Sequence, residues 1–223
     1  MFNFEKNPPI IFFDFDNTIS KKDILGAVIQ KFSISGEWVR HEELWRQGHM
    51  GSAECMELQL KDIRVSKADL FKFINEIPID SDFSGLLEWL KEKEIPVQIL
   101  SDSFTPLIES VLEQHGIKDV PVYANHLEFK DENLIPSYPY RSPDCKRCAH
   151  CKKQRLKAYP DKTRIYVGDG LSDVCAAMEA EIVFAKDDLR AYLAERGSRF
   201  TSFSNLGDVL NSLRKLLPSA VNA

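Results

Sequence analysis

Residues 9–15 read PIIFFDF, a continuous apolar run that ends in acids. An apolar run without alternation is typical of a central strand that is buried on both faces of a parallel sheet. Further along, helical patterns at 83–94, 106–115, 152–159 and 206–217 alternate with strand patterns at 97–100, 120–124, 164–167 and 183–184. This order predicts an α/β fold: a mostly parallel, Rossmann-like sheet with helices on both faces and a ligand site beyond the carboxyl ends of the strands.

Four helical patterns and no strand pattern separate the first strand from the alternating region. Their apolar residues recur three or four positions apart, as on the buried face of a helix. Ser52 and Ser66 are expected to cap two of these helices. We therefore expect a small helical bundle, residues 21–79, inserted into an α/β core that is formed by residues 1–20 and 80–223.

Charge and composition limit the classes of partner. The chain has 223 residues and a formal net charge of −5. Because no global positive charge attracts phosphate backbones or anionic lipids, neither a nucleic acid nor a membrane surface is an expected partner. The apolar run near the amino terminus is too short for a signal-peptide core or a membrane span, so a cytoplasmic protein is expected.

Four polar features lie at or near the expected strand ends: Asp14 with Asp16, Ser101, Lys152, and Asp169 with Asp173. Taken singly, an acid after a strand is most often a turn residue or a helix cap. Taken together, they are the parts that phosphoryl transfer requires, because the reaction needs a nucleophile, a proton donor for the leaving oxygen and cations that neutralise the phosphate.

The acids also fit a magnesium site. Asp14, the Asp16 carbonyl and Asp169 would offer the hard oxygen ligands that Mg²⁺ prefers. Gly168 and Gly170 are expected to let the backbone approach the ion closely. Past the strand end, the backbone can turn so that Asp14 meets phosphorus while Asp16 meets the ester oxygen. The expected activity is a Mg²⁺-dependent phosphomonoester phosphatase.

In combination, the segments DFDNT, ILSDS, CKK and GDGLSD resemble, in order, the four motifs of the haloacid dehalogenase-like phosphohydrolases. The resemblance implies that Asp14 is the nucleophile that forms an aspartyl-phosphate and that Asp16 is the general acid/base. It further implies that Ser101 and Lys152 bind the phosphate.

The same resemblance implies the metal ligands and a role for the inserted helices. Asp169 would hold the metal with Asp14 and Asp16, and Asp173 would support it through water, while Thr18 would shape the loop after the first acids. The inserted helices resemble the superfamily's small cap domain, which closes over small substrates and excludes water.

Within the superfamily, the chain resembles the phosphoserine phosphatase branch, subfamily IB. There a cap acid nine residues after the nucleophile contacts the substrate, and Asp23 occupies that position. The chain is more similar still to 2-hydroxy-3-keto-5-methylthiopentenyl-1-phosphate phosphatases and to phosphocholine/phosphoethanolamine phosphatases, both of which carry cysteines before the motif lysine. Asp102 and Ser103 follow Ser101 where many relatives have a glycine pair, and Asp102 is an expected substrate contact. The implied substrate is a small phosphorylated metabolite.

The five cysteines do not suggest a disulfide framework, because an odd number cannot all pair and the cysteines at 145, 148 and 151 lie close together. Cys145, Cys148 and Cys151 could instead form a structural Zn²⁺ site, because thiolates at this spacing suit tetrahedral zinc. Three thiolates are one ligand short, so His150 or a distant residue would have to complete it. The alternative is a loop of reduced thiols.

Other functions remain open from the sequence. A phospho-accepting, receiver-like signalling protein also uses acids, a hydroxyl group and a lysine, but it needs neither a helical insertion nor an acid at position 16. A dehalogenase of the same superfamily would require no metal, which makes Asp169 hard to explain. A zinc-based nucleic-acid binder would depend on the cysteines alone and disagrees with the acidic balance of the chain.

Overall fold

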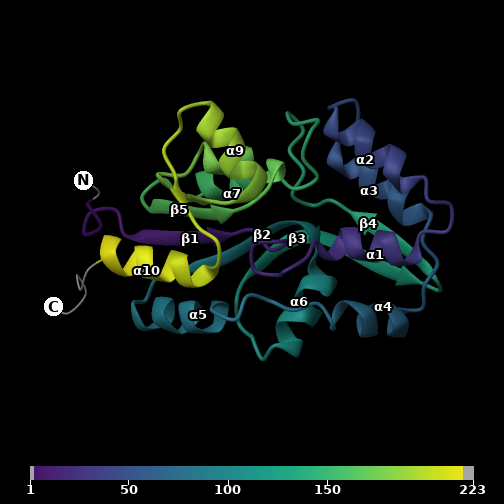
Figure 1. The fold of residues 1–223 in the computed structure, drawn as a ribbon, viewed down its shortest axis with the longest axis horizontal. Coiled ribbons are helices and arrows are strands. Elements are labelled where there is room, and N and C mark those ends of the chain that lie inside the picture. Colours follow the sequence, from purple (N-terminus) through teal and green to yellow (C-terminus); the bar gives the residue numbers. More distant parts are fainter. Residues whose placement is uncertain (1–2, 218–223) are drawn as a thin grey trace. The chain divides into compact units, whose positions relative to one another are not determined.

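The structure is a computed structural model that describes residues 3–217 (Figure 1). The chain divides into two compact units. The first lies within residues 1–21, 79–100 and 152–223, and the second lies within residues 22–78 and 101–151. The second unit thus combines the helical insertion with a later stretch that the sequence patterns assigned to the α/β core. The expected division into a core of 1–20 and 80–223 and a cap of 21–79 stays a prediction.

A parallel sheet forms the centre of the first unit. Its strands are β1 (Pro9–Phe13), the first half of β2 (Val97–Phe104), β5 (Thr163–Gly168), β6 (Ile182–Ala185) and β7 (Thr201–Ser202). β2 and β5 pair with opposite edges of β1, so β1 is central. This explains its unbroken apolar sequence, because side chains on both of its faces are buried.

The register of the central strands brings Asp14, which follows β1, and Asp169, which follows β5, to one edge of the sheet. Phe13, the last residue of β1, lies opposite both Ile99 and Val167. Asp14 follows directly, and its backbone N–H donates to the Val167 carbonyl at 2.9 Å. Since the chain leaves β1 first to one neighbour and later to the other, β1 marks the topological switch point at which such sheets bind ligands.

The helices of the first unit lie on two sides of the sheet. These helices are α5 (Phe83–Glu92), α7 (Lys152–Lys157), α8 (Val174–Ala177), α9 (Asp187–Glu195) and α10 (Leu206–Leu216), and a 3₁₀ turn spans Leu171–Asp173. Figure 1 shows α5 and α10 together below β1, and α7 and α9 together above it. The expected α/β sheet with helices on both faces is confirmed, although the patterns did not predict α9 or β7.

The second unit contains the four expected helices: α1 (Ile24–Phe32), α2 (Trp38–Arg46), α3 (Ser52–Lys61) and α4 (Lys67–Ile74). It also contains the end of β2, α6 (Thr105–Gln114), β3 (Val122–Lys130) and β4 (Asn133–Ser137). β3 and β4 form an antiparallel hairpin. The strand expected at 120–124 therefore starts later and runs further, because the hairpin partner extends its hydrogen bonding.

One of the two expected helix caps is wrong. Ser66 caps α4 as expected, and its side chain accepts the backbone N–H of Asp69 at 3.1 Å. Ser52 is the first residue inside α3, after Gly51 in the cap position. Its hydroxyl accepts from the indole N–H of Trp45 at 2.9 Å, so a tertiary contact has taken the group that the local pattern assigned to capping.

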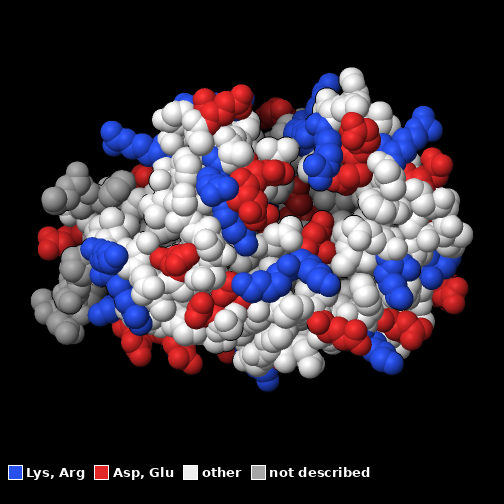
Figure 2. Space-filling model, viewed as in Figure 1, with Lys and Arg blue, Asp and Glu red and all other residues white. Residues whose placement is uncertain are grey.

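Within residues 3–217, the hydrogen-bonded strand order is β4-β3-β2-β1-β5-β6-β7. None of the helices in this part of the chain is both long and apolar enough to cross a bilayer. Acidic and basic side chains are mixed over the face drawn in Figure 2, in agreement with the modest net charge.

Candidate active site

Lys152 is the cation at the centre of an acidic cluster in the first unit. It begins α7, is 3% exposed, and its ammonium group donates to Asp14 Oδ1 and to Asp173 Oδ1, each at 2.6 Å. Asp14 follows β1, and Asp169 and Asp173 follow β5. The structure thus brings together four of the residues that the motifs predicted, from three distant parts of the chain.

Asp173 holds this arrangement through both of its carboxylate oxygens. Oδ1 accepts from Lys152 and, at 2.6 Å, from the hydroxyl of Tyr166. Oδ2 accepts the backbone N–H groups of Asp169 and Gly170, each at 3.0 Å. A carboxylate with four donors has little capacity left for a direct metal bond. This geometry favours a supporting role for Asp173.

Tyr166 was not predicted as part of the site. It is fully buried on β5, and burial is the main reason that its pKa lies well above the ordinary value, with the Asp173 charge adding to the rise. Its hydroxyl therefore stays protonated and donates to Asp173. A tyrosine between the apolar residues Ile165 and Val167 of a buried strand is the feature of the sequence that could have pointed to this role.

Gly168 leaves room for the side chain of Asp173. A Cβ at this position would come within 2.5 Å of Asp173 Oδ2. At Gly170 an added Cβ would meet nothing nearer than Ser172 Oγ at 3.9 Å. Packing thus explains Gly168, and the expectation that both glycines let the backbone approach a metal ion stays a prediction.

The loop after β1 is folded tightly around one carbonyl group. The Phe15 carbonyl accepts the backbone N–H groups of Thr18, Ile19 and Ser20 at 3.2, 2.9 and 3.0 Å. Asn17 takes a left-handed conformation with φ of 55°. The Thr18 hydroxyl donates to Asp169 Oδ1 at 3.0 Å and so links this loop to the one that follows β5. Asp16 lies half-buried in the same loop.

The donor set fits a divalent cation. Asp14, Asp169 and Asp173 can bring ligand oxygens within 4.8 Å of one another. Burial first and the neighbouring carboxylates second, against the opposing effect of Lys152, raise the pKa of Asp14 from 3.8 to about 7 and that of Asp169 to about 9. One lysine thus undercompensates the cluster, and the hard oxygen donors suit Mg²⁺.

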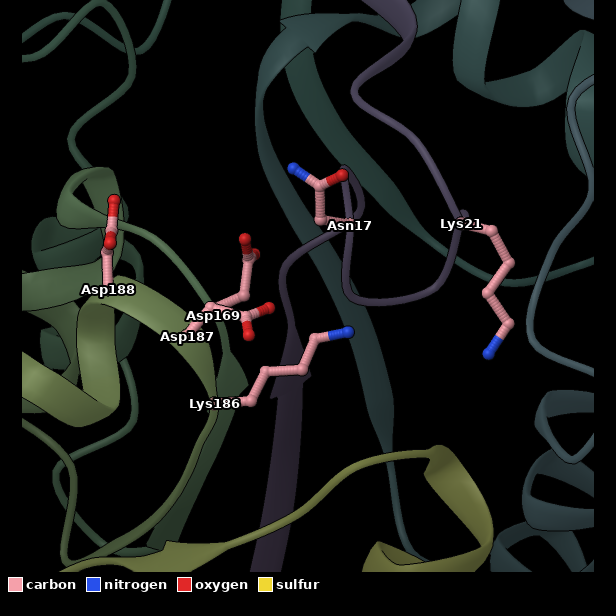
Figure 3. A pocket seen from close by; sticks show the side chains of 6 residues that line it. All are labelled: Asn17, Lys21, Asp169, Lys186, Asp187 and Asp188. Atoms are coloured by element: carbon pink, nitrogen blue, oxygen red, sulfur yellow. The ribbon is translucent and has the colours of Figure 1, made fainter.

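A cavity of about 310 Å³ opens beside the cluster within the first unit. It is lined by Asn17, Lys21, Asp169, Lys186, Asp187 and Asp188. Figure 3 shows Asn17, Asp169 and Lys186 among the side chains around this space. Asp169 thus forms part of the cavity wall, where a small ion can approach it.

Ser101, Asp102 and Asp23 belong to the second unit. Ser101 is fully buried and its hydroxyl accepts the backbone N–H of Ser103 at 2.9 Å. Asp23 caps α1 and accepts the backbone N–H of Gly26 at 2.8 Å. The substrate contacts expected of these three residues stay predictions.

The structure does not support the expected zinc site. Across residues 3–217, the acidic cluster is the group in which three side chains bring metal-ligating atoms within 4.8 Å, and Cys145, Cys148 and Cys151 form no such group. None of these three cysteines forms a disulfide. His150, the candidate fourth ligand, instead uses its ring Nδ1 in a hydrogen bond to the Ser101 carbonyl at 3.1 Å.

Comparison with known proteins agrees with this chemistry. The model of the family described as "Putative Phosphatase" matches residues 9–191. The chain belongs to this phosphatase family. Together with the motifs and the fold, the match makes it a haloacid dehalogenase-like phosphatase, and the receiver-like alternative is not supported.

Curated relatives cover nearly all of this phosphatase. A 2-hydroxy-3-keto-5-methylthiopentenyl-1-phosphate phosphatase of Brevibacillus brevis is 27% identical over 95% of this chain and 98% of the relative. The polyol phosphate phosphatase PYP1 of Saccharomyces cerevisiae is 29% identical over 93% of each chain. Among solved structures, a phospho-aspartyl intermediate analogue of phosphoserine phosphatase superposes with a TM-score of 0.69 at 16% identity, covering 93% of this chain and 99% of the other.

The raised pKa values predict opposite pH effects on the metal-free and metal-loaded protein. A carboxyl group whose pKa is higher in the folded state stabilises that state below its unfolded pKa, and this contribution is lost as pH rises through the folded pKa. For Asp14 and Asp169 the loss extends from about pH 4 through 7 to 9. Mg²⁺ favours the ionised carboxylates, so we expect its stabilising effect to grow with pH.

The measurement is thermal unfolding at about pH 6 and about pH 8, with excess Mg²⁺ or with chelator, at matched ionic strength. We expect the rise in Tm on adding Mg²⁺ to be larger at the higher pH. An equal rise at both pH values would contradict the assignment of these two carboxyl groups to the metal.

Proposed function

We propose that this phosphatase hydrolyses the monoester of a small phosphorylated metabolite in two steps, with the phosphoryl group carried on Asp14 between them. The relatives named for methylthiopentenyl-phosphate and polyol phosphate substrates support a small substrate. The phospho-aspartyl form named for the phosphoserine phosphatase structure supports the covalent step. The observation that carries the proposal is the Lys152 ammonium group shared between Asp14 and Asp173.

Asp14 is the proposed nucleophile, and its Oδ1 already receives a hydrogen bond from Lys152. The lysine charge holds this carboxylate in position and favours its ionised form, as attack on phosphorus requires. Asp173 keeps the lysine in place. Asp16 would protonate the leaving oxygen and then, as the base, take a proton from the water that releases phosphate from Asp14.

The Asp14 carboxylate, the Asp16 carbonyl and Asp169 would hold Mg²⁺, with Asp173 supporting the site from outside. When bound, the ion supplies positive charge against the phosphoryl oxygens. Ser101 and Asp102 are proposed contacts of the phosphate and the substrate. Thr18, through its bond to Asp169, would fix the position of one ligand oxygen.

The first test is hydrolysis of p-nitrophenyl phosphate with Mg²⁺ and with chelator, followed by a panel of metabolites. The panel should contain methylthiopentenyl-1-phosphate, phosphoserine, phosphocholine, polyol phosphates and sugar phosphates. Turnover that requires Mg²⁺ and is fastest on a member of the panel supports the proposal. Metal-independent turnover, or efficient hydrolysis of a folded phosphoprotein with poor rates on the panel, would overturn it.

Asp23 is expected to select among substrates. Because Asp23 also caps α1, Asp23→Ala would remove a cap that contributes about 1 kcal/mol, whereas Asp23→Asn removes the charge and keeps a capping side chain. We expect Asp23→Asn to change the ranking of panel substrates while turnover of p-nitrophenyl phosphate, whose contacts are mostly its phosphate, changes little. A uniform loss on all substrates in kcat/KM assays would place Asp23 in catalysis or folding instead.

A further inference from the structure

The cysteine-rich segment at 145–151 is anchored at both of its ends within the second unit. It follows β4 and precedes α7. The backbone N–H of Cys151 donates to the Tyr140 carbonyl at 2.9 Å, and that of Cys145 donates to the Ser142 carbonyl at 3.1 Å. Local hydrogen bonds thus give the segment a defined shape, although the structure assigns it no metal.

His150 attaches this segment to the end of β2. Its ring Nδ1 lies 3.1 Å from the Ser101 carbonyl, and its backbone N–H donates to Asp102 Oδ1 at 3.0 Å. A carbonyl can only accept, so Nδ1 carries the proton in this bond. The ring is 2% exposed and stacks on Tyr140 with centroids 4.9 Å apart. Packing therefore fixes the orientation of the donor.

The same part of β2 is held from β3. The side-chain amide of Asn125 donates to the Asp102 carbonyl at 2.7 Å. On the other side of that peptide bond, the Ser103 N–H donates to the Ser101 hydroxyl. Ser101 and Asp102 are thus fixed through both carbonyl groups and through one carboxylate oxygen. These are the two residues whose expected partner is the substrate and its phosphate.

Arg147 attaches the other end of the segment to α2 and α3. Its guanidinium donates to the Trp45 carbonyl at 2.6 Å and lies 5.1 Å from the centroid of the Trp45 ring. Its own carbonyl accepts the Ser52 N–H at 2.8 Å. At Gly51, an added Cβ would come within 2.3 Å of the Lys146 carbonyl, so the backbones approach closely here.

We propose that His150 is a positioning residue for phosphate binding, which holds Ser101 and Asp102 through its ring and backbone, and that Arg147 fixes His150 by anchoring the segment on α2 and α3. The inference rests on the proposed function, because it takes Ser101 and Asp102 as contacts of phosphate and substrate. In this proposal the cysteine-rich segment positions the His150 imidazole so that it can donate a hydrogen bond to Ser101. The segment then needs no metal to explain its place in the fold.

The decisive variants separate the donor from the bulk of the ring. His150→Leu keeps an apolar side chain against Tyr140 and removes the donor. His150→Asn restores a donor, because its amide nitrogen is attached to Cγ just as Nδ1 is. His115→Ala is the matched control in the same unit, since the His115 ring also bonds to a backbone carbonyl, that of Ile77 at 3.2 Å.

The first readout is the Kd for inorganic phosphate in the presence of Mg²⁺, measured by calorimetry. We expect phosphate to bind about tenfold more weakly to His150→Leu, a change of about 1.4 kcal/mol. His150→Asn should recover to within about threefold of the wild type, and His115→Ala should match it. The second readout is amide exchange at Ser103, which should accelerate in His150→Leu and not in His150→Asn.

Arg147→Met tests the anchor. We expect a smaller loss of phosphate affinity, about threefold, and no further loss when it is combined with His150→Leu, because both changes act through the same imidazole. Additive losses would overturn the role of Arg147 as the support of His150.

The proposal as a whole is overturned by wild-type phosphate affinity in His150→Leu, or by equal losses in His150→Leu and His150→Asn. Should His150→Leu fail to fold, His150→Gln takes its place, because its amide donor lies one bond further from the backbone. Wild-type phosphate affinity in His150→Gln, or a loss equal to that in His150→Asn, would then overturn the proposal. Hydrolysis of p-nitrophenyl phosphate by the wild type is scored separately. Its absence would overturn the proposed function, whereas an active wild type with an indifferent His150 would overturn the positioning role alone.

Discussion

Asp14→Asn is expected to abolish turnover of every phosphate ester, to at least about 10⁴-fold below the wild type. The amide has nearly the same shape as the carboxylate, but it lacks the negative oxygen that attacks phosphorus. Folding should survive, because Lys152 keeps its bond to Asp173. Without metal above about pH 7, the variant should be at least as stable as the wild type, since burial disfavours the ionised form of Asp14.

Asp16→Asn is the matched comparison for this prediction. It changes the same chemical group two residues away, but it removes a proton donor instead of the nucleophile, so we expect turnover to fall by about 10² to 10⁴-fold. Brief incubation of the wild type with substrate, followed by acid quench and mass spectrometry, should locate a phosphoryl group on Asp14. Near wild-type turnover by Asp14→Asn would contradict the covalent mechanism.

Lys152→Met is expected to damage both activity and stability. Activity should fall by at least about 10³-fold, because the ammonium group would no longer hold the nucleophile or face the phosphate. Removing one partner of a buried ion pair costs about 3 to 5 kcal/mol, since the remaining charges lose their compensation. In Lys152→Met these charges are Asp14 and Asp173.

The stability loss in Lys152→Met should itself depend on pH. Near pH 8 the carboxylates must either ionise without compensation or take up protons, whereas at about pH 5 protonation is easier and the loss should be smaller. Lys153→Met is the control, because Lys153 is adjacent in the chain but partly exposed, and its ammonium group lies 3.8 Å from Glu179. Equal denaturation midpoints for the two variants would contradict the central role of Lys152.

The position of Asp14 and Asp169 at one edge of the sheet is the part of this site that could be predicted from the sequence. An apolar strand followed by Asp14, and a second strand followed by Asp169, are expected to meet because parallel strands end at one edge of the sheet. The structure agrees, with Phe13 opposite Val167. The covalent role of Asp14 and the metal role of Asp169 stay predictions that the experiments above address.

Side-chain partners across the fold could not be predicted. Tyr166 bonds to Asp173, and Trp45 takes the hydroxyl of Ser52, because tertiary packing brings these groups together irrespective of local sequence pattern. His150 illustrates the same limit. Its place among cysteines made it one candidate for a fourth zinc ligand, whereas its ring contacts the backbone of Ser101, a residue far away in the chain.

The central position of β1 has a consequence for synthesis of the protein. Its apolar residues leave the ribosome before those of its neighbours, and one of these neighbours, β5, begins only at Thr163, about 150 residues later. At usual elongation speeds of about 5 to 20 residues per second, that edge of β1 remains unpaired for roughly 8 to 30 s. During this interval an unpaired, apolar strand is open to misassembly, so the nascent chain should depend on chaperones more than the finished protein does.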